Sequence, residues 1–595
     1  MPQLSTEQRN AHVAGQKEIE AVGHFLPNFM EGHKFQPLTL DHFDSMSDGG
    51  LPSIVLPPSL QQVFDYFDGA ENGDVLKSQF LTGLNKGIQA YQANNGGQMP
   101  SDMAIASALS VGAGLLAFND ENKFEHFDSL SADHHESLSA VANIAIVSMA
   151  TMLFNSLPML SMLPNPIGST EVPLINSRFK ANMNTGAFTS EDYLDGAKAC
   201  LNYLESRRKY AMSNSGSGNI YTVTPRLAYS DYAARTPDTG SPVMPFVGGR
   251  VSVRVNGKEV AHDRSRDHGT KVGTHSLIPV QNVTIGSGNT PVLVSAGTVN
   301  LSTHTVSVTF SAALPVGAVV TVVVLADYER KDSNGNYILT PPGAEIDLEY
   351  ASLYADAMRI QVSATQDAAQ QMAAELGISF NAAALGILQN KFYLERNIRL
   401  LEDAKERAEA NDSVVQFDAQ RGVTTGATAA FNDTGEMMQE MSTALDKGKL
   451  MIANKVGGSS AGYDFFVTDN AAILISHISG DRFIRTGSQI GTDTAIVLIG
   501  RFNDGTNVYY VPKNAGLLEE TGSTSEGLLL PRSADPIKAP FVGFTVTPPI
   551  MREALANPFE RTVGVWAKEG ADLNPLSRYS DQAVLIELTN LPHDL

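Results

Sequence analysis

The sequence predicts an α+β protein, because helical and strand patterns occupy separate stretches of the chain. From about Asn381 to Ala410, apolar residues recur at mostly three- and four-residue steps, which predicts one long amphipathic helix. At about 1.5 Å per residue, such a helix extends roughly 45 Å and needs a sheet or a neighbouring subunit to lie on. From Phe246 to Glu329, apolar and polar residues alternate instead, which predicts strands.

The long helix has a predicted apolar stripe and a shorter helix in front of it. The stripe consists of Ile387, Leu388, Phe392, Leu394, Ile398 and Leu401. The shorter helix is expected over Ser363–Leu376, because Ser363 and Gln366 form a capping-box pattern and Gly377 stands where a helix C′ glycine belongs. A charge in the stripe, as in Phe392→Asp or Leu394→Asp, is expected to block folding or assembly.

Length and charge limit the classes of protein to which the chain can belong. With 595 residues it is long enough for two to four domains. Its formal charge is −22 and no basic stripe stands out, so it is not an obvious nucleic-acid binder. In a protein container for DNA, however, a negatively charged inner surface would repel the phosphates and keep the packed DNA from binding to it. Cys200 is the only cysteine, so no intrachain disulfide is possible and folding is expected in a reducing cytoplasm. No secretory signal is expected.

The first part of the chain is expected to be an arm followed by helices. Residues 1–60 are polar and predict a weakly ordered N-terminal arm. Residues 61–245 predict a mostly helical extension or insertion, with a helix over Ser190–Tyr210 and a flexible linker over Ser213–Asn219. Ala140–Leu163 is uncharged and long enough to span a bilayer. Its Asn, Ser and Pro residues, and the lack of flanking Lys or Arg, favour a buried or subunit-interface helix.

Two stretches of this region resemble ligand sites only in part. The first lies between Phe64 and Phe80 and is similar to an EF-hand loop, in which positions 1, 5, 6 and 7 are Asp68, Asn72, Gly73 and Asp74. Positions 3 and 12 are Ala70 and Gln79, so two carboxylate ligands are missing and a helix-turn-helix connector is the expected structure. The second is Asp133-His134-His135-Glu136, whose residues are adjacent rather than spaced for one helix face. We therefore expect no metal site and no cofactor.

The strand region contains two clear turn signals. Asn256-Gly257 predicts a type I′ hairpin turn, and Pro315-Val316-Gly317 predicts a turn before a strand at Val320–Leu325. A further strand is expected where Ile346, Leu348 and Tyr350 alternate with polar residues. From these patterns alone, the region is consistent with a small β-sandwich.

The C-terminal half mixes loops, strands and helices. Asn411–Glu440 is polar and Gly/Thr-rich, which predicts a loop. Lys449–Tyr510 contains strand patterns, a helix near Asp469–Ser479 and the hairpin signal Asn503–Asn507. A last strand is expected at Ala583–Leu588.

One motif suggests an enzyme. Gly458-Ser459-Ser460-Ala461-Gly462 matches the G-x-S-x-G nucleophile elbow, with Asp481 and His593 downstream. That elbow requires a strand before the serine and a helix after it, whereas a strand pattern follows here. A Gly/Ser turn is therefore the expected structure, and a serine hydrolase using Ser460 is the weakest alternative. No catalytic residue is expected.

The order of motifs along the chain resembles that of tailed-phage major capsid proteins, especially T-even-type and giant-phage relatives. The stretch MRIQVSATQDAAQQMAAELGISFNAAALGILQNKFYLERN resembles their spine-helix region, with Glu395, Arg396, Asn397 and Arg399 in place of a Glu-x-Asn-Arg-like cluster. GTVNLSTHTVSVTFSAALPVGAVVTVVVLADYE resembles their extended loop. VYYVPKNAG, GLLLPRSADPIKAPFVGFTVTPP and Asn557–Phe559 follow in the family's order. The resemblance covers about residues 245–590.

This resemblance implies the Hong Kong-97 capsid fold, also called the Johnson fold, and a division into domains. The expected parts are an N-terminal arm (1–60), a helical extension (61–245), an extended β-hairpin loop region (246–345), a peripheral domain with the spine helix (346–411 and 554–595) and an axial domain (412–553).

It also implies a structural, non-catalytic role. The chain would assemble with itself into hexameric and pentameric capsomers of an icosahedral head that encloses double-stranded DNA without sequence-specific binding. Portal, scaffold and decoration proteins would be its partners, with no membrane. Assembly would take place in the host bacterial cytoplasm and the product would be the virion capsid. The runner-up is an encapsulin-like compartment shell.

Overall fold

The structure, a computed structural model, contains both helices and strands, mostly in separate segments, and confirms the α+β prediction. It describes residues 6–31, 34–35, 39, 56–68, 72–95, 97–121, 138–163, 165, 169–215, 218–263, 273–280, 292–376, 380–419, 434–458, 460–478, 480–487, 490, 495–533, 535–557 and 560–591. The chain forms two compact units, Met1–Asn176 with Tyr350–Leu595 (unit 1) and Ser177–Glu349 (unit 2).

Unit 1 begins with helices that share one apolar core. They are α1 (Thr6–Phe25), α3 (Pro58–Asp68), α4 (Gly73–Asn94), α5 (Asp102–Glu121) and α6 (Leu138–Phe154), with η1 (Leu26–Phe29), β1 (Met30–Glu31) and β2 (Lys34–Phe35) after α1. The composition predicted a weakly ordered arm where the structure has α1. Val22 and Phe25 lie about one turn apart on the same side of α1. Both are buried in the core together with Leu26 of η1, which explains why this polar stretch is helical.

Helix α6 is the expected buried helix. Ala145, Met149, Met152 and Leu153 are buried against the neighbouring helices, so the uncharged stretch is explained by packing within the protein. The stretch leaves the helix after Phe154 and continues into strand β3 (Leu160–Leu163). In the described parts of the chain, no helix is long and apolar enough to cross a membrane.

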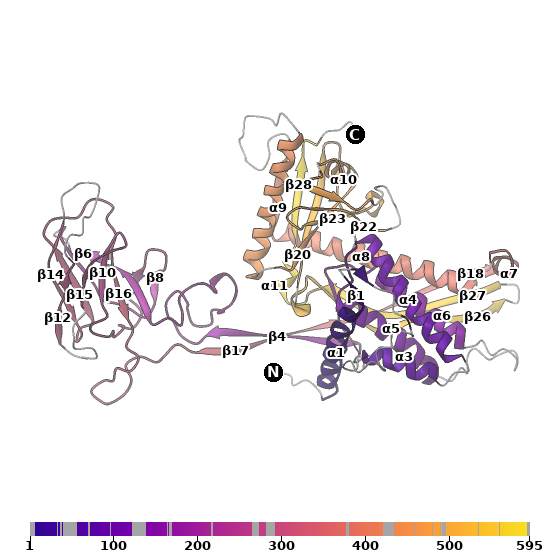
Figure 1. The fold of residues 1–595 in the computed structure, drawn as a ribbon, viewed down its shortest axis with the longest axis horizontal. Coiled ribbons are helices and arrows are strands. Elements are labelled where there is room, and N and C mark those ends of the chain that lie inside the picture. The colour runs from indigo at the N-terminus through magenta and orange to yellow at the C-terminus, as the bar shows by residue number, and fades with distance from the viewer. Residues whose placement is uncertain are drawn as a thin grey trace. The chain divides into compact units, whose positions relative to one another are not determined.

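The long helix lies on a sheet with two very long strands (Figure 1). The helix is α8 (Phe380–Ala410), and its predicted bounds are correct to one residue. The sheet has the order β18-β27-β26-β3, in which β18 (Asp356–Thr365), β27 (Glu560–Leu573) and β26 (Phe541–Asn557) are antiparallel neighbours. Because β26 has 17 residues and β27 has 14, the sheet is long enough to support a 31-residue helix.

The shorter helix in front of α8 starts later than predicted. Strand β18 continues through Ser363 to Thr365, and Thr365 caps α7 (Gln366–Gln371) by accepting a hydrogen bond from Ala368 N to its Oγ1 at 3.3 Å. A π-helical turn, η3 (Met372–Leu376), follows. The predicted capping box fails because Ser363 pairs with Thr562 in the sheet instead. Gly377 lies outside the described residues.

The apolar stripe of α8 is rotated from the predicted one. Of the predicted stripe, Leu401 is buried as expected but Ile387 is 71% exposed, whereas Tyr393 and Leu400, which were not predicted, are buried in the core. Phe392, Leu394 and Ile398 are half-buried. The actual buried face also contains polar residues, because Gln389, Arg396 and Asn397 make hydrogen bonds there.

The second sheet of unit 1 has the order β19-β28-β25-β20-β23-β22-β21, with β24 (Glu520–Thr521) paired to β25. Its strands are β19 (Val414–Asp418), β28 (Val584–Thr589), β25 (Thr524–Arg532), β20 (Gly462–Val467), β23 (Asn507–Tyr510), β22 (Val497–Phe502) and β21 (Phe483–Arg485). Helices α9 (Thr434–Val456) and α10 (Asp469–Ser476), the latter as expected, pack on one face. Short turns η4 (Lys513–Ala515), η5 (Pro536–Lys538) and α11 (Ser577–Ser580) complete the unit.

Alternate residues of this sheet belong to two different cores. Phe465 and Leu529 pack with α9 and α10, while Phe466, Leu528 and Leu530 pack with the core of the N-terminal helices. The sheet is therefore covered on both faces, which explains the nearly continuous apolar runs in its strands. The expected loop at Asn411–Glu440 instead includes β19 and the start of α9; residues 420–433 lie outside the described residues.

Unit 2 is a β-sandwich, as the residue patterns alone allowed, rather than a set of extended hairpins. One sheet has the order β13-β11-β10-β16-β5 and the other β12-β14-β15-β7-β6. The first contains β5 (Arg207–Ala211), β10 (Ser252–Val255), β11 (Lys258–His262), β13 (Ile278–Pro279) and β16 (Val320–Leu325). The second contains β6 (Ser213–Asn214), β7 (Ile220–Val223), β12 (Thr274–Ser276), β14 (Val294–Asn300) and β15 (Thr305–Phe310). One core joins them, with Tyr210 and Val322 from the first sheet and Val308 and Phe310 from the second.

Two predictions fail and one holds at the turns of this sandwich. Ser190–Tyr210 is not a helix: it contains the short turn η2 (Gly196–Lys198) and the start of β5. The expected linker Ser213–Asn219 begins with strand β6, whose Ser213 and Asn214 pair with β7, and residues 216–217 lie outside the described residues. The predicted I′ turn is confirmed, because Asn256 and Gly257 have φ angles of 46° and 83° between β10 and β11.

Strands β4 (Glu171–Ala181) and β17 (Ala344–Tyr354) form a two-stranded sheet through which the chain enters and leaves unit 2. The predicted alternating strand at Ile346, Leu348 and Tyr350 is β17 and is confirmed. Its apolar side chains lie on the exposed face; Ile346 is 66% exposed. A small hairpin of β8 (Tyr229–Asp231) and β9 (Thr236–Pro237) completes unit 2.

Candidate functional site

The cluster at Arg396, Asn397 and Arg399 fastens α8 to the sheet beneath it. Arg396 forms an ion pair with Glu569 of β27, and Arg399 Nη2 donates a hydrogen bond to Ala571 O at 2.6 Å. Asn397 Nδ2 donates to Asn155 O at 2.8 Å, just beyond the end of α6. Three polar residues within one turn of α8 thus fix the helix to two different neighbours.

The ion pair at the centre of this cluster is buried. The side chains of Arg396 and Glu569 are only 4% and 5% exposed. Arg396 Nε and Nη2 donate to Asn397 Oδ1, and its guanidinium carbon lies 4.8 Å from the centroid of the Tyr393 ring. Because both charges have left water, the removal of either partner would leave the other uncompensated. Burial raises the pKa of Tyr393 far above its usual value, so its ring stays neutral.

Two further hydrogen bonds join α8 to α6. Gln389 Nε2 donates to Ser148 Oγ at 2.8 Å in a fully buried position, and Asn155 Nδ2 donates to Asn390 Oδ1 at 3.0 Å. The direction and rotation of α8 are therefore set by polar contacts as well as by apolar packing.

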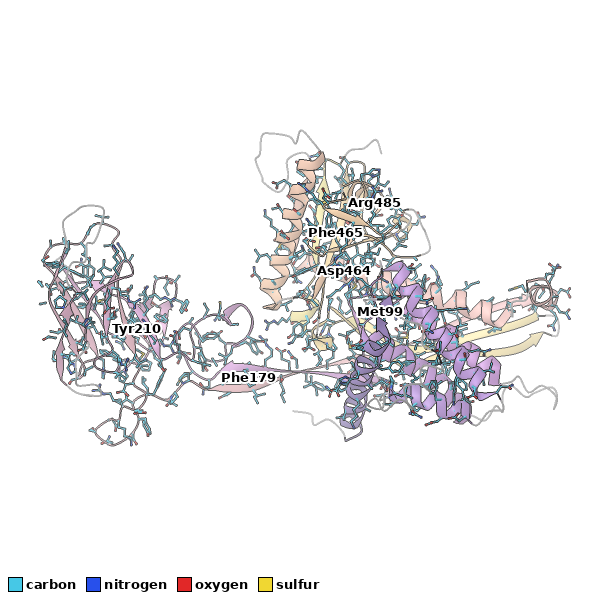
Figure 2. The ribbon with its side chains drawn as sticks, viewed as in Figure 1. Met99, Phe179, Tyr210, Asp464, Phe465 and Arg485 are labelled. Atoms are coloured by element: carbon cyan, nitrogen blue, oxygen red, sulfur yellow. The ribbon has the colours of Figure 1, made fainter. Side chains whose placement is uncertain are left out.

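A second buried polar cluster joins the loop after α4 to the second sheet of unit 1, which contains β20, β23 and β25. Asp464 of β20 is fully buried and accepts two hydrogen bonds at 2.7 Å from Arg532 of β25 (Figure 2 labels Asp464). Arg532 also donates to Gln98 Oε1 at 2.8 Å and to Tyr509 Oη at 3.0 Å, and Tyr509 donates to Asn95 Oδ1 at 2.8 Å. The ion pair raises the pKa of Arg532 against the effect of its burial. No local pattern indicated this cluster, since its members are far apart along the chain.

Ser460 lies in the connection between α9 and β20, and Ser459 lies outside the described residues. Ser460 follows helix α9 and precedes strand β20, which is the reverse of the strand-to-helix order that a nucleophile elbow needs. No hydrogen bond joins Ser460 to Asp481 among the described residues, and His593 lies outside them.

The EF-hand-like stretch is a connector between two helices, as expected. Asp68 ends α3 and Gly73 begins α4, while residues 69–71, including Ala70, lie outside the described residues. Asp68 forms an ion pair with Lys77. Asp133 to Glu136 also lie outside the described residues. Across the parts of the chain that are described, no group of His, Cys, Asp or Glu is arranged to hold a metal ion.

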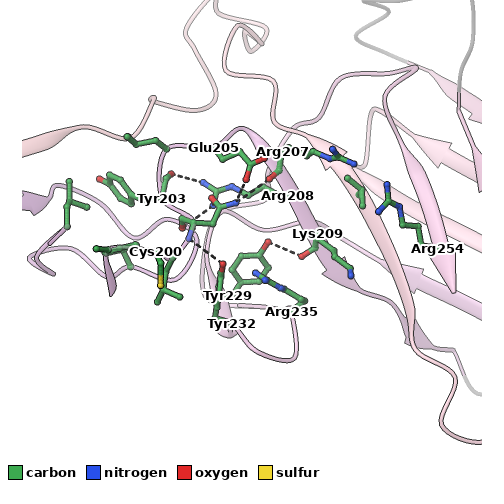
Figure 3. A pocket seen from close by; sticks show the side chains of 17 residues that line it. Cys200, Tyr203, Glu205, Arg207, Arg208, Lys209, Tyr229, Tyr232, Arg235 and Arg254 are labelled. Carbon is green, nitrogen blue, oxygen red and sulfur yellow. Dashed lines mark hydrogen bonds between the residues drawn. The ribbon is translucent and has the colours of Figure 1, made fainter. Parts of the chain in front are cut away.

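Unit 2 contains a pocket of about 670 Å³ that the sequence did not predict (Figure 3). It lies where the loop Cys200–Glu205, strand β5 and the β8–β9 hairpin meet. Arg207, Arg208, Lys209, Arg235 and Arg254 supply its basic lining residues. Its only acidic lining residue is Glu205.

No protein-family model and no curated protein sequence matches this chain. Among solved structures, it is similar to the capsid of the jumbo bacteriophage PhiKZ, with 9% identity over 72% of this chain and 91% of that chain and a TM-score of 0.35. It is also similar to the capsid of Ralstonia phage GP4, with 12% identity over 42% and 78% of the two chains and a TM-score of 0.29. For the capsid of Myoviridae phage XM1 the corresponding values are 10%, 44%, 82% and 0.27. All three are phage capsids.

Proposed function

We propose that this chain is the major capsid protein of a tailed phage and has the Hong Kong-97 fold. The observation that carries the proposal is the 31-residue helix α8, held along the long β26–β27 hairpin by the buried Arg396–Glu569 pair. The resemblance in the order of motifs implied such a spine helix. The polar cluster quoted for that resemblance, Arg396, Asn397 and Arg399, is where α8 is bonded to the sheet. A rigid helix on a long sheet suits a subunit whose work is geometric.

In this proposal, the four-strand sheet with α8 is the peripheral domain, expected at 346–411 and 554–595. The sheet flanked by α9 and α10 is the axial domain, expected at 412–553, to which β28 adds a strand. Unit 2 takes the place of the extended loop as a whole sandwich. Residues 1–60 supply the arm and residues 61–176 the extension, whose helices share an apolar core with the axial sheet, while residues 177–245 of the expected extension belong to unit 2.

Many copies would tile into hexamers and pentamers that enclose double-stranded DNA in an icosahedral head. Ring-closing contacts of this kind are heterologous, so two different surfaces of each copy must meet. The row of exposed apolar side chains Ile346, Leu348 and Tyr350 on one face of β17 supports a role in assembly. The role is non-catalytic. The further partners would be portal, scaffold and decoration proteins, with assembly in the host bacterial cytoplasm and a final place in the virion capsid.

Electron microscopy of the purified protein, after its size is measured by light scattering, tests this proposal. We expect closed or partial shells, tubes or rings of six subunits. A protein that stays monomeric at every concentration and salt condition, with and without its scaffold partner, would contradict it. Shells isolated from a host culture that hold a protein cargo and no DNA would instead indicate a compartment.

A further inference from the structure

The basic pocket of unit 2 stands out against the charge of the whole chain. The chain carries 64 acidic and 42 basic residues, yet this pocket is lined by five basic residues and one acidic residue. Like charges placed close together repel one another unless something compensates them. A concentration of positive charge in an acidic protein therefore requires an explanation.

The outward face of one sheet supplies three of these cations. Arg207 and Lys209 are two residues apart on β5, so they point to the same side, and both are exposed. Lys209 is paired with Val323 of β16, which is paired in turn with Ser252 of β10. Arg254 is two residues beyond Ser252 and therefore shares this face. Glu259 of β11 is the register partner of Arg254, on the side away from β5.

Arg208 adds a buried charge to the pocket wall. It is completely buried, and its guanidinium donates to the side chain of Asn202 and to the backbone carbonyl of Tyr203, the latter at 2.9 Å. Within the part of the chain that the structure describes, the hydrogen-bond partners of Arg208 are Asn202 and Tyr203, both neutral, and its Nε has no hydrogen-bond partner. A buried charge with only neutral partners is costly, and a nearby anion would offset that cost.

Another part of the wall combines the fifth cation, Arg235, with aromatic rings. The guanidinium carbon of Arg235 lies 3.9 Å from the centroid of the Tyr232 ring and 5.9 Å from that of Tyr229. Arg235 has a φ angle of 60°, a left-handed conformation that a non-glycine residue adopts only at a cost. The turn therefore holds this arginine at the pocket despite backbone strain.

We propose that this pocket binds a carboxylate-rich segment of a second copy of the chain. The inference rests on the proposed function, in which copies meet side by side, and it names one of the contacts between them. The positive pocket is complementary to the excess of carboxylates that every other copy presents. Its apolar lining residues Phe188, Leu194 and Leu201 suit the side chains and stems of a peptide better than a bare inorganic anion.

The only cysteine provides a reporter. Cys200 lines the pocket and is exposed, so a fluorophore attached there senses its occupancy (Figure 3). At low ionic strength, we expect short poly-glutamate to give a saturable fluorescence change. Arg207→Glu/Lys209→Glu is expected to weaken this binding at least about tenfold, whereas Arg207→Lys/Lys209→Arg retains it. Lys258→Glu/Lys331→Glu makes the same change in net charge outside the pocket and is the matched control. Calorimetric titration of unlabelled protein repeats the measurement without the fluorophore.

Particles provide the second readout. In assembled wild-type protein, Cys200 should react with a maleimide at least about tenfold more slowly than in free subunits, because a neighbouring segment covers it. Shells with unprotected Cys200, formed by a protein that does not bind poly-glutamate, would overturn the pocket inference and leave the proposed function standing. Poly-glutamate binding by a protein that never assembles would overturn the proposed function and the second-copy assignment together. Tighter binding of inorganic phosphate or a DNA oligonucleotide than of poly-glutamate would assign the pocket to phosphate instead.

Discussion

At the scale of single residues, buried polar groups decide where the helices of unit 1 lie. Glu18 of α1 is only 5% exposed, and its carboxylate accepts hydrogen bonds from Ser59 N, at the start of α3, at 3.1 and 3.3 Å. Burial raises the pKa of Glu18, although the Ser59 hydrogen bonds oppose this. A carboxyl whose pKa is higher in the folded protein stabilises the fold below its unfolded pKa of 4.5, and this contribution is lost as the pH rises through the folded pKa.

Glu18→Gln should therefore gain stability relative to the wild type as the pH rises above 4.5, because the amide keeps an acceptor for Ser59 and carries no charge. Melting temperatures of both proteins across this pH range measure the effect. Glu20→Gln, on the exposed side of the same helix, is the control and should follow the wild type. A constant difference between Glu18→Gln and wild type at every pH would refute the assignment.

The Arg396–Glu569 pair gives a larger predicted effect. Arg396→Ala leaves the buried Glu569 carboxylate without its partner, which should lower the free energy of unfolding by about 3–5 kcal/mol. Denaturant titration of unassembled protein measures this loss. Lys391→Ala removes an ion pair with Glu395 on the same helix, whose side chains are 64% and 63% exposed, and should change stability by less than about 0.5 kcal/mol. Equal effects of the two variants would be inconsistent with an anchoring role for Arg396.

At the scale of elements, α8 shows how an exposed apolar residue differs from a buried one on the same helix. Leu401→Ala should cost about 2–5 kcal/mol, because Leu401 is completely buried. Ile387→Ala should cost less than about 0.5 kcal/mol in the free subunit, because Ile387 is 71% exposed. Chemical unfolding measures the loss of stability in each variant. Similar losses would mean that Ile387 is buried like Leu401, as the predicted stripe required.

The length of α8 could be predicted from the sequence, but its buried face could not. Periodicity counts apolar residues, so it found the helix and missed the burial of Gln389, Arg396 and Asn397, which depends on partners far away in the chain. The helix expected at Ser190–Tyr210 is absent for a different reason. Glu191 and Gly196 have φ angles of 76° and 84°, which interrupt any helix.

At the scale of the whole molecule, the sequence predicted turns and strands of unit 2 better than their arrangement. The Asn256-Gly257 and Pro315–Gly317 turns are local features, and both were correct. The second, however, carries the chain from β15 in one sheet to β16 in the other, so strands that are neighbours in sequence do not pair. Which sheet a strand joins depends on the shared core, and a local pattern contains no information about it. The basic pocket depends on that arrangement too.

The separate cores predict that the two units melt independently. Among the described residues, the core of unit 2 contains Phe310 and no residue of unit 1, and the core around Leu401 contains no residue of unit 2. Phe310→Ala should therefore lower only one calorimetric transition of the unassembled chain, by ~2–4 °C for each kcal/mol lost. Leu401→Ala should lower only the other, by a smaller shift for each kcal/mol because unit 1 is larger. A single transition that both variants shift equally would mean that the units unfold as one cooperative body. Two transitions would mean that the stability of the unit 2 sandwich can change without a change in the stability of unit 1, which contains the helix α8 on which the proposed shell depends.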